Sequence, residues 1–372
     1  MGLNITPAFR VVANNQDITD TIRSRFKSLR ITDETDNNSD MLELQLADHD
    51  PSDPIQLPPA GAELEAFIGY DGDVRRMGLY ICDEVEISGY PGSMTLRARA
   101  APFEASKGGK NDLQTQKTRT WKKGTTIGGM VQRMAGEHGM EAAVSGSLAS
   151  IALPLTVQSQ ESDMNLLLRL AKQHDAIAKP GGGRLMFVKR GESTSASGER
   201  IPDVTLTPAD GSGYKVSIVS REKTGTTIAY YRDVRGATRQ EVKLGSGEPI
   251  VRLRMAYADR EAAEAAARAK HQEQARQTRT LSYTLPGRET LMAEATVVMQ
   301  GFRDGVDGRW LVKHAEHSIG SEGYVTSIQC EQPNSADAVK AASSAAASSG
   351  LYRRTLSRPL LSEDICFSPS KR

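Results

Sequence analysis

The stretch that decides the fold is GFRDGVDGRWLV, residues 301–312. Its first half contains the pair Asp307 and Gly308, which is typical of a tight turn. Trp310 and Val312 follow two positions apart, so their side chains point to the same face of a strand. The stretch therefore predicts a turn that leads into a β-strand with one buried face.

More short strands are predicted on both sides of this stretch. The segment LSYTLPGR at residues 281–288 precedes it and ends in a second turn, at Pro286 and Gly287. An alanine-rich helix is predicted at residues 259–277. We expect residues 203–332 to form a small antiparallel β barrel that carries this helix on its outside.

The first 105 residues show the same kind of pattern. Apolar and polar residues alternate in residues 40–46 and 63–70, with the period of a half-buried strand. Asp71 and Gly72 give a strong hairpin signal. About six short strands at this spacing predict an antiparallel barrel or sandwich over residues 1–105, and we expect the barrel.

Residues 106–202 predict a small mixed α/β domain between the two barrels. One amphipathic helix is expected near residues 126–138 and a second near residues 163–174. Ser162 is a suitable cap for the second helix, and Asp163 is well placed against its dipole. The predicted fold class is therefore β-rich α+β, with two antiparallel barrels and this middle domain.

Residues 333–372 differ from the rest of the chain. They start with an alanine- and serine-rich run and end in a mildly basic segment. This composition is typical of a linker followed by a flexible tail. Docking of the tail on a partner is the alternative interpretation.

Composition argues against several classes of protein. Lysine and arginine number 47 and aspartate and glutamate 46, so the basic excess of a sequence-specific nucleic-acid binder is missing. The widely spaced cysteines Cys82, Cys330 and Cys366 do not suit a disulfide framework or a zinc site, and reduced cysteines fit assembly in a cytoplasm. No run approaches 18 apolar residues and the start lacks a signal-peptide core, so no membrane anchoring is expected.

Catalytic, cofactor and metal sites are not predicted either. His314 and His317 are three positions apart, but in a strand such residues point to opposite faces and cannot chelate one ion. Residues 181–183 are three glycines without the spacing or lysine of a phosphate-binding loop. We expect no enzyme activity and no cofactor.

Two segments resemble the phage late control protein D family, the baseplate hubs of contractile tails, and the related hub part of type VI secretion spike proteins. The first is ESDMNLLLRLA, residues 161–171. The second combines LSYTLPGR and GFRDGVDGRWLV with His317 and with GYVT at residues 323–326. Residues 291–295 depart from the family pattern, which more often has a glycine there.

The resemblance implies structural roles for ten motif residues. These are Glu161, Ser162, Asp163, Pro286, Gly287, Gly305, Gly308, Trp310, His317 and Tyr324. Each also has a plain physical interpretation as a helix start, a turn or a barrel-strand residue.

The resemblance further implies an assembly function. In that family the hub is a trimer whose chains each carry two tail-tube-like barrels, and six barrels can match a sixfold tail tube to a threefold central spike. It would nucleate tail assembly in the host bacterial cytoplasm and remain in the virion tail baseplate. The implied partners are the central spike, tail tube, tape-measure and baseplate wedge proteins.

Alternatives from other classes remain open. A hub could carry a cell-wall hydrolase activity in residues 106–202. A gene regulator would need a recognition helix, and the helix near residues 126–138 is a poor candidate because it contains two glycines. The sequence does not separate a phage from a headless tail-like bacteriocin.

Overall fold

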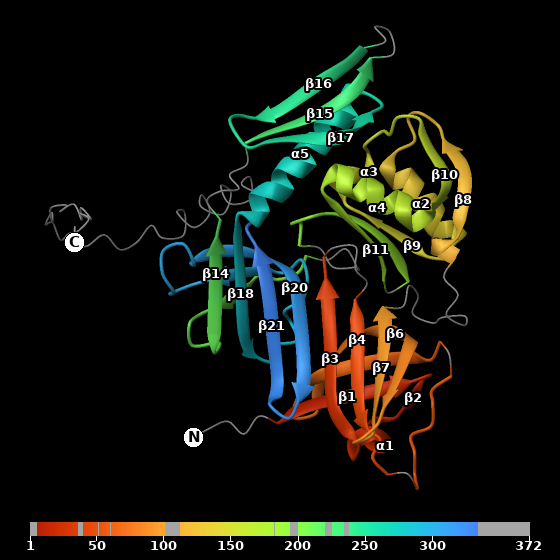
Figure 1. Ribbon diagram of the computed structural model, residues 1–372, viewed down its shortest axis with the longest axis vertical. Coiled ribbons are helices and arrows are strands. Elements are labelled where there is room, and N and C mark those ends of the chain that lie inside the picture. Colours follow the sequence, from red (N-terminus) through yellow and green to blue (C-terminus); the bar gives the residue numbers. More distant parts are fainter. Residues whose placement is uncertain are drawn as a thin grey trace, which may run out of the picture. The chain divides into compact units, whose positions relative to one another are not determined.

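The computed structural model describes residues 6–35, 40–50, 52–59, 61–100, 112–181, 183–193, 200–219, 225–233 and 238–333 (Figure 1). The described chain is mostly β-strand, as predicted. The linker and tail predicted at 333–372 lie outside the described residues from position 334 onward.

One sheet of 13 strands runs through most of the structure. Eleven strands form a single path, and two more, β13 (Val204–Leu206) and β19 (Thr296–Met299), branch from β20. In sheet order the path is β14 (Gly213–Ile218), β18 (Arg279–Pro286), β21 (Gly323–Glu331), β20 (Gly308–Gly320), β3 (Phe26–Glu34), β4 (Met41–Ala47), β7 (Ser93–Ala100), β6 (Asp73–Ser88), β5 (Glu63–Tyr70), β1 (Pro7–Ala13) and β2 (Gln16–Asp17).

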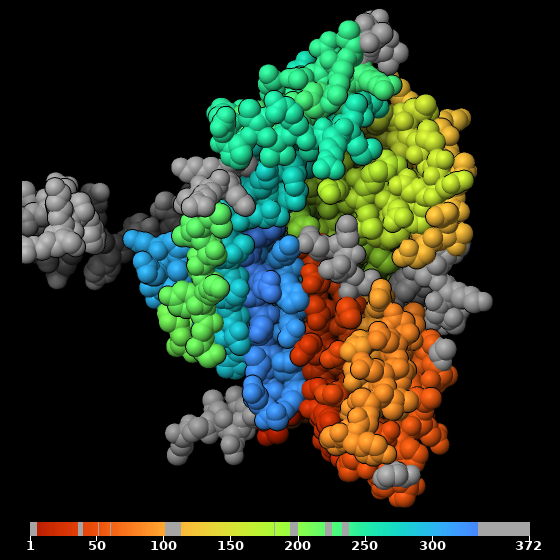
Figure 2. Space-filling view, viewed as in Figure 1, coloured from red at the N-terminus to blue at the C-terminus, as the bar shows by residue number. Residues whose placement is uncertain are grey.

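The structure corrects the prediction of two antiparallel barrels. Strand β3, from the first predicted barrel, pairs antiparallel with β20, from the second, with Ile31 opposite His317. Figure 2 shows the two differently coloured segments lying directly against each other. The pairings among the described strands form an open path rather than two closed rings, so the two halves share one sheet.

Each half nevertheless has its own hydrophobic core. We call β1–β7, with the short helix α1 (Thr19–Arg23), the first lobe, and β13, β14 and β18–β21 the second lobe. Leu42, Leu64 and Ile68 are among the fully buried residues of the first core, and Leu281 and Trp310 belong to the second. The alternation seen in the sequence places these side chains on the inner face of the sheet.

The two lobes repeat the same strand path. In the first lobe a long strand, β6, pairs with β5 through its first half and with β7 through its second. In the second lobe β20 pairs in the same way with β19 and then with β21. Strands β4 and β3 then follow β7 as β18 and β14 follow β21. One difference is that β1 pairs antiparallel with β5, whereas β13 pairs parallel with β19.

A register irregularity at the same place supports this equivalence. The β6–β7 ladder shifts between Cys82 and Glu84, and the β20–β21 ladder shifts between Val312 and His314. When the two strands are aligned at these shifts, Tyr80 of β6 corresponds to Trp310 of β20. Both aromatic side chains are buried, at 3% exposure. A β-bulge bends a strand, so both lobes bend their long strand at the same step.

The second lobe carries an insertion where the first has a short link. Residues 35–40 connect β3 to β4, whereas residues 219–278 connect the equivalent strands β14 and β18. We call the described elements of this insertion the inserted unit: β15 (Thr226–Asp233), β16 (Thr238–Gly245), β17 (Ile250–Tyr257) and α5 (Arg260–Gln277). These strands form a separate sheet, so the expectation that they belong to the second barrel is wrong.

Alanines explain how α5 packs on the small sheet. Ala263 and Ala267, four residues apart, are fully buried against Ala229 of β15. Asp259 begins the helix because its side chain accepts a hydrogen bond from the backbone N–H of Ala262. The predicted helix at residues 259–277 is confirmed, and small side chains let it approach the sheet closely.

The middle unit lies between the lobes in the sequence and contains the two predicted helices. Thr126 caps α2 and Ser162 caps α4, each through a hydrogen bond to the third backbone N–H beyond it. Its helices and strands are η1 (Asp112–Gln114), β8 (Gln116–Trp121), α2 (Ile127–Glu137), β9 (Glu141–Val144), α3 (Gly146–Ala149), β10 (Thr156–Ser162), α4 (Asp163–His174), β11 (Ala176–Gly181) and β12 (Arg184–Lys189). Their apolar faces enclose a core of their own.

Candidate functional site

The ten motif residues fall into three groups rather than one pocket. Glu161, Ser162 and Asp163 lie where β10 passes into α4. Pro286 ends β18 and Gly287 follows it, while His317 lies on β20 and Tyr324 on β21. Gly305, Gly308 and Trp310 lie at the turn that leads into β20 and on that strand.

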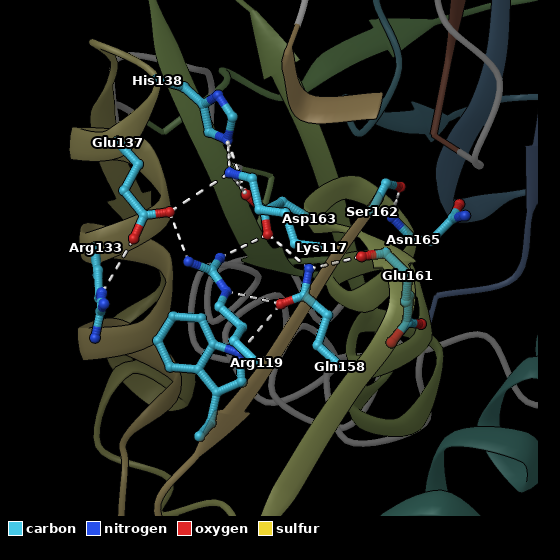
Figure 3. Close-up of polar contacts among 11 residues, drawn as sticks. Lys117, Arg119, Arg133, Glu137, His138, Gln158, Glu161, Ser162, Asp163 and Asn165 are labelled. Carbon is cyan, nitrogen blue, oxygen red and sulfur yellow. Dashed lines mark hydrogen bonds and ion pairs between the residues drawn. The ribbon is translucent and has the colours of Figure 1, made fainter. Parts of the chain in front are cut away.

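Asp163 is the centre of the first group (Figure 3). Its side chain is fully buried. Lys117 Nζ and His138 Nε2 each lie 2.8 Å from Asp163 Oδ2. Arg119 Nη2 lies 2.6 Å and Gln158 Nε2 2.8 Å from Oδ1. Both carboxylate oxygens are therefore saturated by donors from β8, from β10 and from the end of α2.

The electrostatics of Asp163 follow from these contacts. Burial alone raises the pKa of a carboxyl group, but the hydrogen bonds from Lys117 and its other partners outweigh it and lower the pKa of Asp163 to about 2. The carboxylate also lies in the first turn of α4, where the helix dipole favours negative charge. Asp163 is a structural anion that fastens α4 to the β8–β10 hairpin and to α2.

The two neighbours of Asp163 in the motif act locally. Ser162 Oγ accepts a hydrogen bond from the backbone N–H of Asn165 and caps α4. Glu161 accepts two hydrogen bonds from Arg169, eight residues further along the chain, at 3.0 and 2.8 Å. All three motif residues thus determine where α4 starts and how it is held.

His317 lies at the centre of the second group. It is 1% exposed, and burial lowers the pKa of its imidazole, which favours the neutral ring. His317 Nε2 lies 2.8 Å from the backbone oxygen of Leu291, so Nε2 carries the proton and donates it. His317 Nδ1 then accepts from the hydroxyl of Tyr324, at 3.0 Å, or of Thr326, at 3.1 Å.

Gly287 is required by the ring of Tyr324. A Cβ atom on Gly287 would lie 2.0 Å from Tyr324 Cδ1. The backbone N–H of Gly287 donates to the carbonyl of Tyr324 at 2.8 Å, and Pro286 lies opposite Val325 in the ladder. These residues place the end of β18 flat against the β20–β21 hairpin, beside the contact with β3.

The third group builds the entry to β20. Gly305 and Gly308 have φ values of +87° and +121°, which suit glycine. Trp310 is 3% exposed, and its indole N–H donates to the backbone oxygen of Val306 at 2.8 Å. The turn predicted from the sequence therefore closes over the tryptophan that fills the second core.

Sequence analysis missed a charged cluster that joins the middle unit to both lobes. Lys179 Nζ of β11 lies 3.2 Å from Asp33 and from Asp40, which belong to the first lobe. Asp33 Oδ2 also accepts the backbone N–H of Ala293, from the second lobe, at 2.9 Å. Lys179 follows a short apolar run, and nothing in its spacing distinguishes it from a lysine exposed at a strand end.

The two carboxyl groups beside Lys179 titrate in opposite directions. Burial raises the pKa of Asp40 to about 7, and the neighbouring charge of Asp33 adds to that rise. Burial also acts on Asp33, but the ammonium of Lys179 and the N–H of Ala293 lower its pKa. Asp33 is therefore the permanent counter-charge of Lys179 at neutral pH.

A second missed cluster joins α5, α4 and β21. Arg276, 3% exposed, donates to both oxygens of Asp175, at 2.6 and 2.8 Å. Its Nε lies 2.9 Å from Glu331 at the end of β21, and Arg190 lies 3.6 Å from the same carboxylate. The inserted unit, the middle unit and the second lobe therefore meet at this bidentate arginine.

The departure from the family pattern also has a structural counterpart. Glu294 has a φ of +65°, in the region that favours glycine. Its buried side chain accepts the backbone N–H of Gly191 at 2.8 Å. Burial raises the pKa of Glu294 to about 7. The chain thus makes with glutamate a turn for which glycine is better suited.

Metal binding and membrane insertion were also tested on the described residues. They contain no group of three or more His, Cys, Asp or Glu side chains that could hold a metal ion. No helix within them is both long and apolar enough to cross a bilayer. The clusters around Asp163, His317, Lys179 and Arg276 fix how elements pack on one another.

Comparison with known proteins decides the family. A family model described as "Phage tail baseplate hub (GPD)" matches residues 110–323. The "Probable baseplate hub protein" of Escherichia phage 186 is 30% identical over 89% of this chain and 94% of its own length, and that of Escherichia phage P2 matches with the same identity and coverage. The chain belongs to the phage tail baseplate hub family. The resemblance inferred from the two motifs is confirmed.

A solved structure shares the fold of this chain. The 43 kDa tail protein of prophage MuSo2 from Shewanella oneidensis aligns with a TM-score of 0.63. The alignment covers 88% of this chain and 99% of that protein at 15% identity. At such low identity the likeness shows a common fold.

Neutralising Asp163 is expected to destabilise the hub strongly. Asp163→Asn leaves Lys117 and Arg119 facing a neutral group, and breaking a buried ion pair in this way costs about 3–5 kcal/mol. Urea unfolding at pH 7 measures the loss. Glu141→Gln, which removes an exposed ion pair with Arg184, is the matched control and should cost below about 1 kcal/mol.

The effect of Asp163→Asn should also depend on pH. The folded-state pKa, about 2, is below the ordinary 3.8, so the stabilisation is present above about pH 4 and is lost as the pH falls towards 2. The difference between the two proteins should therefore shrink over that interval. A difference that stays constant from pH 7 to pH 2 would contradict the role of the carboxylate.

A methyl group on Gly287 should disturb the contact with Tyr324. Gly287→Ala forces the ring or the strand end to move, and overpacking of this kind costs about 1–3 kcal/mol. Gly136→Ala in α2 is the control, because no atom lies within 4 Å of its added Cβ and alanine favours a helix by about 1 kcal/mol. Thermal unfolding should show opposite shifts in Tm; equal shifts would rule out the packing explanation.

Proposed function

We propose that this hub is a trimeric symmetry adaptor that joins a sixfold tail tube to a threefold central spike and nucleates tail assembly. The repeated strand path of the two lobes, with the same register shift in β6 and β20, carries the proposal. Three chains with two similar lobes each would offer six similar surfaces to the tube and three whole chains to the spike. Closed rings of this kind are built from head-to-tail contacts.

The lobes are proposed to act as tail-tube-like barrels once the ring is closed. Strand β3 of the first lobe already pairs with β20 of the second, so one chain supplies a continuous arc of sheet. A ring made of such arcs has an inner wall of paired strands. That wall would face the tape-measure protein in the virion tail baseplate.

The middle unit and the inserted unit are proposed to face outward or downward, where baseplate wedge proteins or the spike would bind. Both are fastened to the lobes by ion pairs, which are half-buried at Lys179 and buried at Arg276. A rigid attachment suits a part that must hold its partners at a fixed position. We propose no catalytic activity for this hub, because Asp163, the most deeply buried acid of the middle unit, is fully neutralised by its neighbours.

The solution mass tests the adaptor. Light scattering is expected to give a trimer for the purified chain, or a monomer that forms a 3:3 complex with the spike protein. Tail-tube protein added to either form should bind to one end only. A monomer that ignores both the spike and the tube proteins would contradict the proposal, and the middle unit should then be assayed for peptidoglycan hydrolysis.

A further inference from the structure

Two of the unpaired strand edges in the described sheet belong to β14 and to β6. β14 pairs with β18 on one side only, at the end of the sheet. The second half of β6, residues 83–88, pairs with β7 on one side, while β5 stops at Ile81 on the other. Figure 1 shows β14 and β6 in opposite lobes of the same sheet.

Both edges expose apolar side chains. Ile87 on β6 is 59% exposed, and on and beside β14 Ile218 is 60% exposed, Tyr214 43% and Val219 37%. An unpaired edge with exposed apolar residues is a template for pairing with another chain. The segment carrying β14 lies on the visible surface of the second lobe (Figure 2).

The repeat of the two lobes shows what these edges match. The shared register shift makes β6 the equivalent of β20, with Glu84 at the place of His314. The pairing continues from β7 through β4 to β3 in the first lobe and from β21 through β18 to β14 in the second. Strand β14 is therefore the equivalent of β3, and Val216 corresponds to Ile31. Inside the chain, β20 and β3 are the two strands that pair to join the lobes.

We propose that β14 of one chain pairs antiparallel with residues 84–88 of β6 in the next chain, in the register of the internal β3–β20 contact. This inference rests on the proposed trimer and names the interface that closes it. In the internal contact His317 lies opposite Ile31. The equivalent pair in the proposed contact is Ile87 opposite Val216. In the same way, Ala315 lies opposite Asp33 in the internal contact, and the equivalent pair is Val85 opposite Ile218. Each of these two pairs places an exposed isoleucine, Ile87 or Ile218, against a valine that is partly buried in its own lobe.

A transposed ion pair supports the same register. Across the internal contact Arg30 of β3 lies 3.7 Å from Glu316 of β20. The equivalent residues are Lys215 of β14 and Glu86 of β6, with the same signs of charge on the same strands. Lys215 is exposed and makes no ion pair within the described part of the chain, so its ammonium is available to the next copy. Glu86 Oε2 lies 3.0 Å from Arg97 in its own chain, which leaves Glu86 Oε1 for the ammonium of Lys215.

The proposed contact also satisfies the backbone. Pairing of two edges gives the free N–H and C=O groups of β6 and β14 their partners, and the contact is head-to-tail because the two edges differ. Repeated three times, it would alternate with the three internal β3–β20 contacts. The result is a closed belt of sheet in which all six contacts between lobes have the same geometry.

Charge reversal tests the contact on the assembled full chain, alone or with the spike protein. Glu86→Lys and Lys215→Glu should each weaken association by about tenfold, since each replaces an attraction by a repulsion. The double variant Glu86→Lys/Lys215→Glu should restore it. Circular dichroism of each variant checks that the fold is kept, and Glu141→Lys, an exposed change in the middle unit, is the control.

Cysteine pairing tests the register independently. In a Cys366→Ser background, with Cys82 and Cys330 buried, Ile87→Cys/Val216→Cys should form covalent trimers on mild oxidation. The shifted pair Ile87→Cys/Ser217→Cys should not, because neighbouring residues point to opposite faces. If the wild type forms a trimer but the charge variants still associate and the cysteine variants do not cross-link, the edge pairing is overturned and the proposed function is not. A wild type that forms neither a trimer nor a 3:3 complex would overturn the proposed function, and this contact with it.

Discussion

The antiparallel pairing of β3 with β20 is the contact on which the rest of the structure depends. It joins strands about 280 residues apart in the sequence and turns two lobes with separate cores into one sheet. Ile31, Ala315 and His317 are buried along it, so a slip by one residue would turn this apolar face to solvent. The angle between the lobes, and with it the curvature of any ring built from them, is set by this ladder.

Half-buried and buried ion pairs then fix the remaining parts to that ladder. Lys179 reaches Asp33, on β3 itself, and Asp33 also holds the backbone of Ala293 from the other lobe. Arg276 holds Asp175 and Glu331 in the same manner at the end of β21. Such pairs add little net stability over apolar packing, but a misplaced unit would leave a charge buried without its partner. They therefore determine where the middle and inserted units sit.

The sequence revealed the local structure well and the connections between units poorly. Alternating residues predicted the strands of both lobes, and Ser162 predicted the start of α4, because these signals lie within a few residues of each other. The 16-residue strand β6 contains two register shifts and the 13-residue strand β20 contains one, and no local pattern marks them. Strand sharing between lobes and the clusters around Lys179 and Arg276 depend on pairs more than 100 residues apart. A single sequence carries no distance between such residues.

The motif residues illustrate the same limit. Gly287 and Tyr324 were marked by the family resemblance, yet their meaning, a glycine flattened against an aromatic ring, appears only in three dimensions. Glu294 was visible as a departure from the family pattern, and the structure adds that its backbone adopts the conformation glycine prefers. The contacts of these three residues hold neighbouring segments of the fold together.

We propose that two equivalent lobes per chain turn a threefold assembly into a sixfold surface. Electron cryomicroscopy of the hub bound to its tail-tube protein tests it most directly, with the map reconstructed without imposed symmetry. The account predicts six lobes at one height around a common channel, alternating between first and second lobes, with each tube subunit seated on one lobe. Lobes at two different heights, or tube subunits that contact only one kind of lobe, would contradict it.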